Sequence, residues 1–281
     1  MSHDRALVLG GGASLGGAWT AGMLAGFAAA GIDLAAADTV IGTSAGAVIG
    51  ARLTSGAAAE ELYGGQLDGT APAPAVGVTL GQTARFLWAA LGSRDPERSV
   101  RRLGRAALAS RTVPESTVFE TVADLLEGVR EWPDRELRIA SVDARTGALE
   151  MFRADSGIPL PAAVAASCAV PVVWPPVSVA GRLWMDGGSR STANVHLARG
   201  HRRVVALAPV PKAVGPHPHA VAQGAELAAA GTRVAVLGPD RAARRAMGRN
   251  LLDHSRRPAA ARAGFAQATA CAATVAAIWS R

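Results

Sequence analysis

The chain has 281 residues, of which 49% are apolar and only 18% are charged. This composition supplies enough apolar side chains for a large core and excludes a wholly disordered protein. The net charge is +7, and Lys212 is the single lysine among the 29 basic residues. We attribute the excess of arginine mainly to the codon bias of a GC-rich genome. An affinity for anionic surfaces such as acidic lipid headgroups is the functional alternative.

Several partners and compartments are disfavoured by the composition. Nucleic-acid binding is not expected, because the arginines are scattered and the aromatic residues that would stack on bases make up 4%. Cys168 and Cys271 lie far apart without metal-ligand spacing, so we expect buried, reduced thiols and neither a metal nor a cofactor. The N-terminus lacks an apolar stretch of signal-peptide length, and no segment offers about 20 uninterrupted apolar residues. We therefore expect a cytoplasmic protein without a membrane span, in peripheral contact with an anionic membrane surface. The oligomeric state stays open.

The first fifty residues alternate between apolar strands and helices of small residues. Residues 6–9 and 39–41 are short apolar runs, typical of buried strands. Helices rich in glycine and alanine are predicted over 16–30 and from Ala45 onward. This alternation predicts a layered α/β fold with a largely parallel sheet.

The middle of the chain changes character. Residues 66–82 carry prolines and glycines and predict a loop, and residues 82–130 are more helical and more charged. Phe86, Leu87, Trp88 and Leu91 share one face of a predicted helix, which either packs on the core or forms a lid or lipid-facing cap.

Sheet signals return in the second half of the chain. Strands are predicted over 136–142, 148–152, 179–185, 203–207 and 233–237. A short helix is predicted over 161–167, and an alanine-rich stretch over 259–278 predicts a packed helix. No repeat and no linker separates these segments. We predict a single domain over residues 1–281, with a helical cap insertion around 66–130.

Three consecutive glycines, residues 10–12, lie between the first strand and the first helix. Glycines bring backbone N–H groups close to a ligand, and the following helix adds its partial positive end. The loop therefore predicts an anion site, for either a phosphate or a transient oxyanion. A dinucleotide site is the weaker alternative, because the next strand ends in Gly42-Thr43-Ser44 instead of an acidic residue that would hold the ribose.

Ser44 lies between Gly42 and Gly46 in a G-x-S-x-G pattern, after a predicted strand and before a predicted helix. The pattern is typical of a nucleophile elbow, a sharp turn that holds a serine hydroxyl exposed. The alternative is a tight turn without chemistry. A neighbouring glycine-rich anion loop favours the elbow, because nucleophile and oxyanion donors would meet at one edge of the sheet.

A serine nucleophile needs a base, which in the familiar triad is a histidine oriented by a carboxylate. None of the six histidines lies in an obvious late-loop motif, although His254 stays a candidate. Asp186 follows an apolar strand and precedes Gly187 and Gly188. A carboxylate on this turn can accept the serine proton directly, and the alternative is a turn-forming Asp-Gly pair.

In combination, these features resemble the patatin-like phospholipase family. The resemblance rests on the glycine-rich loop, the elbow at Ser44 and the D-G-G motif at Asp186, in the family's order over most of the chain. It extends to Ala166-Ser167, to Pro171 and to residues 190–194, of which Arg190 and Asn194 are candidates to orient the Asp186 loop. The resemblance implies a three-layer α/β/α fold with a mostly parallel central sheet and a helical cap.

The resemblance also implies an activity, the hydrolysis of lipid acyl esters by a Ser–Asp dyad without a cofactor. Ser44 would be the nucleophile and Asp186 the general base. The implied oxyanion hole consists of Gly10, Gly11, Gly12 and Ala13, and the implied supporting turns contain Gly42, Gly46, Gly187 and Gly188.

The loop departs from the family pattern in one respect. The family often carries a basic residue two places after the third glycine, whereas residues 13–17 contain neither arginine nor lysine, and the loop is about one residue longer. A catalytically inactive lipid-binding or regulatory protein of the same fold is therefore the second hypothesis. Acyl transfer to an alcohol or lysolipid is an alternative outcome of the same chemistry.

Overall fold

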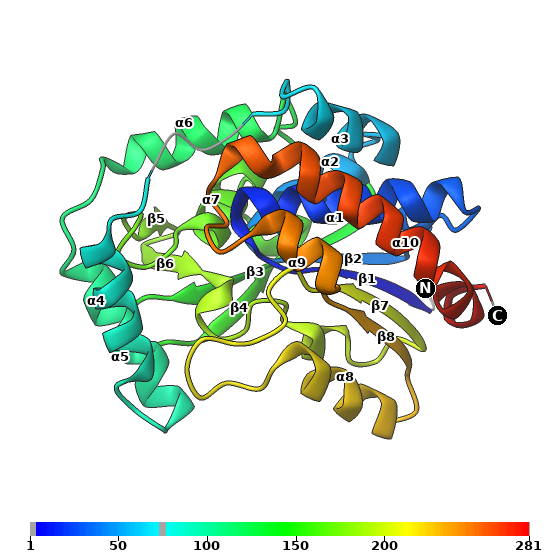
Figure 1. The fold of residues 1–281 in the computed structure, drawn as a ribbon. Helices are drawn as coiled ribbons and strands as arrows, with labels where there is room; N and C mark the ends of the chain where they lie inside the picture. Colours follow the sequence, from blue (N-terminus) through cyan, green and yellow to red (C-terminus); the bar gives the residue numbers. More distant parts are fainter. Residues whose placement is uncertain (1–3, 73–76, 281) are drawn as a thin grey trace.

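The computed structural model describes residues 4–72 and 77–280 (Figure 1). Within these residues the strands form one eight-stranded sheet in the order β5-β6-β3-β2-β1-β7-β8, with β4 paired to β3. The strands are β1 (Arg5–Leu9), β2 (Thr39–Gly42), β3 (Glu136–Asp143), β4 (Leu149–Phe152), β5 (Val177–Val179), β6 (Arg182–Asp186), β7 (Arg203–Leu207) and β8 (Arg233–Leu237).

The centre of the sheet is parallel and one end is antiparallel. Strands β3, β2, β1, β7 and β8 run parallel to one another, whereas β4, β5 and β6 are paired antiparallel. Residues 6–9 of β1 are fully buried, as expected of a strand covered on both faces. The predicted α/β fold with a mostly parallel sheet is confirmed.

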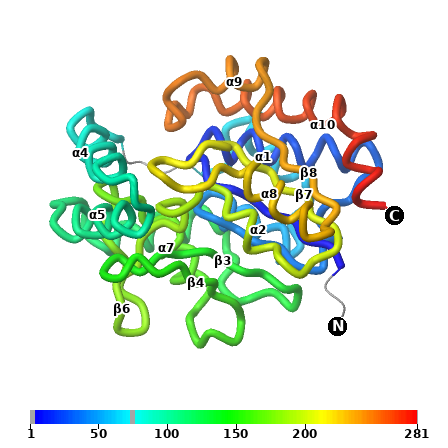
Figure 2. Tube along the Cα trace, turned by 90° about the horizontal axis from the view of Figure 1, so that it is seen from below, coloured from blue at the N-terminus to red at the C-terminus, as the bar shows by residue number. Residues whose placement is uncertain are grey.

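Helices cover both faces of the sheet (Figures 1 and 2). The apolar side chains of α1, α2, α7 and α10 form one large core with one face, and α8 packs on the other. The α-helices are α1 (Ala13–Ala29), α2 (Ala45–Thr54), α3 (Ala59–Leu67), α4 (Leu80–Leu91), α5 (Pro96–Leu108), α6 (Glu115–Leu125), α7 (Leu160–Cys168), α8 (Ala220–Ala229), α9 (Arg241–Met247) and α10 (Arg257–Trp279). Short 3₁₀ helices are η1 (Leu34–Ala36), η2 (Ala154–Ser156), η3 (Gly187–Ser189), η4 (Val195–Ala198) and η5 (His254–Arg256).

The alanine-rich C-terminal segment forms α10, which lies alongside α1. Small side chains allow this close approach, since a Cβ atom on Gly22 of α1 would lie 2.0 Å from the carbonyl oxygen of Ala261. The sequence prediction of a packed helix is therefore correct. No helix in the described part of the chain combines the length and apolarity needed to cross a membrane.

One predicted strand, residues 179–185, is instead a hairpin. The strands β5 and β6 pair antiparallel, and Val179 is paired with Arg182. The two residues between them, Ala180 and Gly181, have φ angles of 50° and 72°. A two-residue turn with both φ angles positive usually carries Asn or Asp first, so the alanine gave no sign of a turn in the sequence.

The segment predicted as a cap contains α4, α5 and α6. Ala89 and Ala90 of α4 pack with residues of α5 against Val142 and Met185 at the antiparallel end of the sheet. The other side of α4 is open, with Trp88 70% exposed and Leu91 62% exposed. The assignment of residues 66–130 as an insertion in a single domain stays a prediction.

Candidate active site

The parallel register brings the glycine-rich loop and the Ser44 elbow together. Leu9, the last residue of β1, is paired with Gly42, the last residue of β2, so the chains leaving both strands are neighbours. A Cβ atom on Gly46 would lie 2.0 Å from the carbonyl oxygen of Leu9. Only glycine fits at position 46, which accounts for the second glycine of the G-x-S-x-G pattern.

Ser44 has the backbone geometry of a strained elbow. Its φ is 54° and its ψ is −123°, a combination that non-glycine residues rarely adopt. Such strain is stored mainly at functional sites, where surrounding contacts hold it. Here the Ser44 N–H donates to Oγ of Ser167 at 2.9 Å, and that hydroxyl donates to the Ala140 carbonyl at 2.7 Å. The buried Ser167 therefore anchors the elbow to β3.

Asp186 ends β6 and is 5% exposed. Its Oδ1 accepts the N–H of Gly188 at 2.6 Å. Burial raises the pKa of Asp186 from its ordinary value of 3.8 to about 6, although its interactions with the Ser44 hydroxyl and the Gly188 N–H oppose the rise. The carboxyl is therefore ionised at neutral pH, more basic than an ordinary aspartate, and adjacent to the Ser44 hydroxyl.

Asn194 joins the two motifs. Its side-chain amide donates to Oγ1 of Thr43 at 3.1 Å and to the Gly187 carbonyl at 3.2 Å. The residue before Ser44 and the residue after Asp186 are thus held by one buried side chain. Arg190 points elsewhere, since its guanidinium forms an ion pair with Glu97 of α5.

Cys168 lines the cavity, whereas the sequence analysis predicted a buried core thiol. It is a free cysteine of intermediate exposure, as is Cys271. Desolvation, followed by the negative charge of Asp186, raises the pKa of the Cys168 thiol. The thiol is therefore protonated at neutral pH and is not a competing nucleophile.

The glycine-rich loop is partly committed to structural hydrogen bonds. The N–H of Gly10 donates to the Leu207 carbonyl at 2.9 Å, and that of Gly11 donates to the Thr192 carbonyl at 2.7 Å. Within the described chain no backbone acceptor pairs with the N–H groups of Gly12 and Ala13. Ala13 begins α1 with φ 52° and lines the cavity with Ser44. The amides free to meet an oxyanion are thus at the helix end of the loop.

A cavity of about 640 Å³ opens above Ser44. Its wall is mostly apolar and includes Val48, Leu62, Val122 and Trp174. Among the described residues that line it, none is a histidine and none carries a carboxylate. The charged lining residues are Arg52, Arg249 and Arg257.

If Asp186 takes the proton of Ser44 during ester hydrolysis, as the resemblance to the family implies, kcat should rise with pH around an apparent pKa of about 6, the value for Asp186. Below that pH the carboxyl keeps its proton and cannot accept the proton of Ser44. Each further decrease of one pH unit then lowers kcat about tenfold. Fatty-acid release measured between about pH 4.5 and 8.5 tests this. A midpoint near the ordinary aspartate value, or a flat profile, would contradict a buried carboxylate base.

Two contributors to the site were missed in the sequence. Ser167 was noted only as part of the resemblance, and its bond to the Ser44 amide depends on the position of α7. Arg257 gave one signal, an arginine just before the alanine-rich stretch, where a helix was predicted to begin.

Comparison with known proteins identifies the family. The family model described as patatin-like phospholipase matches residues 7–199, well over half of the chain. No curated protein matches the sequence.

Two solved structures are similar in fold. VipD from Legionella pneumophila is 16% identical, with 73% of this chain and 50% of that chain covered and a TM-score of 0.42. The type III effector protein ExoU is 17% identical, with 96% and 53% covered and a TM-score of 0.39. The chain thus spans about half the length of each. The match over residues 7–199 shows that the chain belongs to the patatin-like phospholipase family.

Proposed function

We propose that the chain hydrolyses lipid acyl esters, with Ser44 as nucleophile and Asp186 as general base. Membership of the family supports a lipid hydrolase. The observation that carries the finer proposal is the contact between a strained, partly exposed serine and a buried carboxyl whose pKa is about 6. No histidine among the described lining residues offers an alternative base.

The proposed reaction has two halves. Ser44 Oγ forms a bond to the ester carbonyl carbon while its proton passes to Asp186, and the oxygen that becomes negative accepts the N–H groups of Gly12 and Ala13. The bond to the leaving alcohol then breaks, and the alcohol takes the proton from Asp186. In the second half a water molecule gives a proton to Asp186 while its oxygen bonds to the acyl carbon. The bond from that carbon to Ser44 Oγ then breaks, and Asp186 returns the proton to Ser44 Oγ. Fatty acid and alcohol are the products.

Hydrolysis of p-nitrophenyl acyl esters by the purified chain tests the proposal. Turnover that prefers acyl chains long enough to fill the apolar cavity is expected. If lipid vesicles bind while no ester is turned over, the chain is an inactive lipid-binding protein. If added glycerol or lysolipid captures the acyl group, the chain is an acyltransferase.

Binding of a dinucleotide is the less supported alternative. The N–H groups of Gly10 and Gly11 are hydrogen-bonded to carbonyl groups, so only those of Gly12 and Ala13 are left to meet a pyrophosphate. The strand after the loop ends at the Ser44 elbow and offers no acidic residue for a ribose.

Peripheral contact with a membrane is part of the proposal. Leu80 is 90% exposed, and Leu87, Trp88 and Leu91 on the same helix are also exposed. Leu80 lines the cavity as well, so the exposed apolar side of α4 adjoins the site. A helix with apolar side chains open to solvent beside a lipid site is suited to dip into a bilayer surface.

Replacing Trp88 and Leu91 by serine is expected to weaken sedimentation with anionic liposomes by about tenfold or more, because two large apolar side chains no longer enter the bilayer. Val221→Ser is the matched control, since Val221 is 63% exposed on α8. Unchanged sedimentation of the double variant would show that α4 does not contact the membrane. Equal binding of the unmodified chain to neutral and anionic liposomes would show that the basic charge does not contribute to membrane binding.

A further inference from the structure

Arg257 is a buried charge in the wall of the cavity. It is the first residue of α10, is 6% exposed and lines the same cavity as Ser44. It lies beyond residues 7–199, the part of the chain that the family model matches. The family match therefore assigns no role to Arg257.

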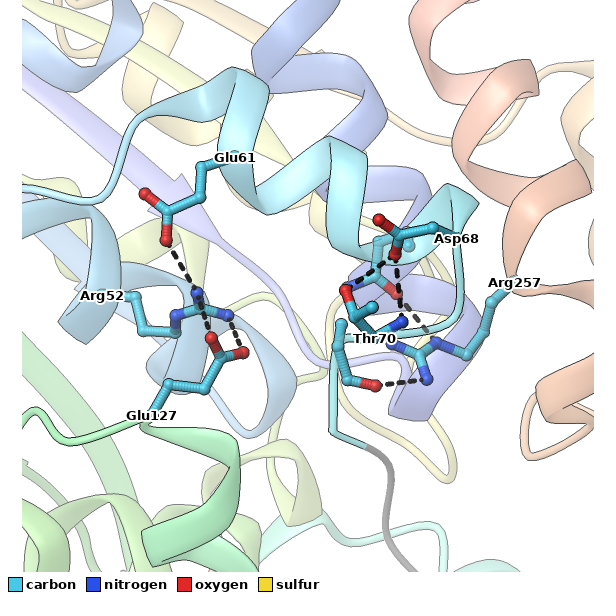
Figure 3. A network of polar contacts seen from close by, with 8 residues as sticks. Arg52, Glu61, Asp68, Thr70, Glu127 and Arg257 are labelled. Carbon is cyan, nitrogen blue, oxygen red and sulfur yellow. Dashed lines mark hydrogen bonds and ion pairs between the residues drawn. The ribbon is translucent and has the colours of Figure 1, made fainter.

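In the described part of the chain, the two hydrogen-bond partners of the Arg257 guanidinium are neutral groups (Figure 3). Its Nε donates to Oε1 of Gln66 at 2.9 Å, and its Nη1 donates to the Ala71 carbonyl at 2.8 Å. Within the described chain Arg257 forms no ion pair with a carboxylate, and its hydrogen bonds are donated by Nε and Nη1. The group is thus fixed in position while its charge is not neutralised.

Arg52, in the same wall, shows the contrast. Its guanidinium forms ion pairs with Glu127 at 2.6 Å and with Glu61 at 3.5 Å (Figure 3). Arg52 is therefore compensated by the protein itself, whereas Arg257 is not. A buried arginine normally has a carboxylate partner, because an isolated buried charge is costly.

The helix makes the position of Arg257 less favourable still. The N-terminus of an α-helix carries partial positive charge, so a cation in the first turn is destabilising. Burial lowers the pKa of Arg257, which reports the same desolvation. An anion bound beside the guanidinium of Arg257 would offset the cost of burying its charge.

We propose that Arg257 binds the anionic headgroup oxygens of a single-chain acyl ester, a phosphate or a carboxylate, while the ester carbonyl lies at Ser44. This inference rests on the proposed function. The cavity of about 640 Å³ has apolar walls for one acyl chain and no carboxylate among its described lining residues to repel the anion. Arg257 thereby supplies the positive charge that the glycine-rich loop lacks.

Binding tests the inference without catalysis. In the Ser44→Ala background, calorimetry compares dodecyl phosphate, dodecanoate, dodecanol and inorganic phosphate. At least one dodecyl anion should bind about tenfold or more tighter than dodecanol, a typical advantage for a charge-assisted hydrogen bond. Tighter binding of dodecyl phosphate identifies a phosphate site, and tighter binding of dodecanoate a carboxylate site. Equal affinity for dodecanol and both anions would overturn the inference. Binding of inorganic phosphate as tightly as dodecyl phosphate would also overturn it, because the dodecyl group would then contribute nothing to the affinity.

The same ligands are then compared in the variant Arg257→Gln. It should lose the preference for the anion and keep the affinity for dodecanol, and Arg257→Lys should restore part of the preference. Arg262→Gln is the control, because it removes an exposed charge from the same helix. An equal loss of affinity for dodecanol and for both anions would assign Arg257 a purely structural role and overturn the inference. If Arg257→Gln does not fold, Arg257→Lys is the variant compared with the unmodified chain: it should keep the affinity for dodecanol and lose part of the preference for the anion, and an unchanged preference would overturn the inference.

Turnover separates this inference from the proposed function. For 1-dodecanoylglycerol 3-phosphate against 1-dodecanoylglycerol, kcat/KM should favour the phosphate in the unmodified chain, and Arg257→Gln should reduce that ratio about tenfold or more. No hydrolysis of either ester would defeat the proposed function and leave the binding result standing. Hydrolysis of both with the same ratio in both proteins would defeat the role of Arg257 alone.

Discussion

Replacing Ser44 by alanine is expected to lower kcat for ester hydrolysis by a factor of about 10⁴ or more, because no other group in the site replaces the nucleophile. The neighbouring Cys168 cannot substitute, since its raised pKa keeps the thiol protonated. The fold should persist, because the anchoring bond to Ser167 comes from the backbone N–H of residue 44. Initial rates on p-nitrophenyl octanoate measure the effect.

Ser55→Ala is the matched control for this variant. Ser55 lies exposed at the other end of α2 and outside the cavity, so its removal should leave the rate unchanged. Melting temperatures of both variants verify folding. A Ser44→Ala protein that keeps more than a few per cent of the rate would exclude Ser44 as the nucleophile.

Asp186→Asn is expected to have two effects of opposite sign. The rate should fall by about 10³–10⁴, because an amide cannot accept the serine proton. The free energy of unfolding at pH 8 should rise by up to about 3 kcal/mol, because the variant no longer buries a charge. The amide oxygen can still accept the N–H of Gly188, so the turn is retained.

The expected pH dependence of the stabilising effect follows from the shifted pKa of Asp186. The folded pKa of Asp186, about 6, lies above the ordinary 3.8, so between these values the folded state binds more protons than the unfolded state. Stability from this group is therefore highest below the lower value and is lost as the pH rises to about 6. Urea unfolding at pH 4 and pH 8 should show the variant gaining stability only at pH 8. Equal losses of activity and stability would mean that Asp186 only holds the turn.

The sequence predicted the elements whose signals are local. The apolar run over residues 6–9 and the spacing of Gly42, Ser44 and Gly46 required a buried strand and a sharp turn, and the structure has β1 and the elbow there. The parallel pairing of β1 with β2 then follows from the strand–helix alternation. The position of Ser44 next to the glycine-rich loop was thus predictable from the order of the residues alone.

The features of the site that the sequence did not predict depend on contacts between residues far apart in the sequence. The Gly10 and Gly11 amides are occupied by carbonyls of Leu207 and Thr192, which lie nearly two hundred residues away in the sequence. The same holds for the neutral partners of Arg257, because Gln66 and Ala71 reach it only through the packing of α3 beside α10. Patterns within one segment carry no information about such pairs.

Labelling with a fluorophosphonate, with the adduct mapped by mass spectrometry, tests the central claim most directly. The reagent reacts with a serine only where a base activates the hydroxyl and oxyanion donors stabilise the product. The account predicts one adduct on Ser44, absent in Ser44→Ala and strongly reduced in Asp186→Asn. A folded protein that takes up no label, or that is labelled on another residue, would contradict an activated nucleophile at the elbow.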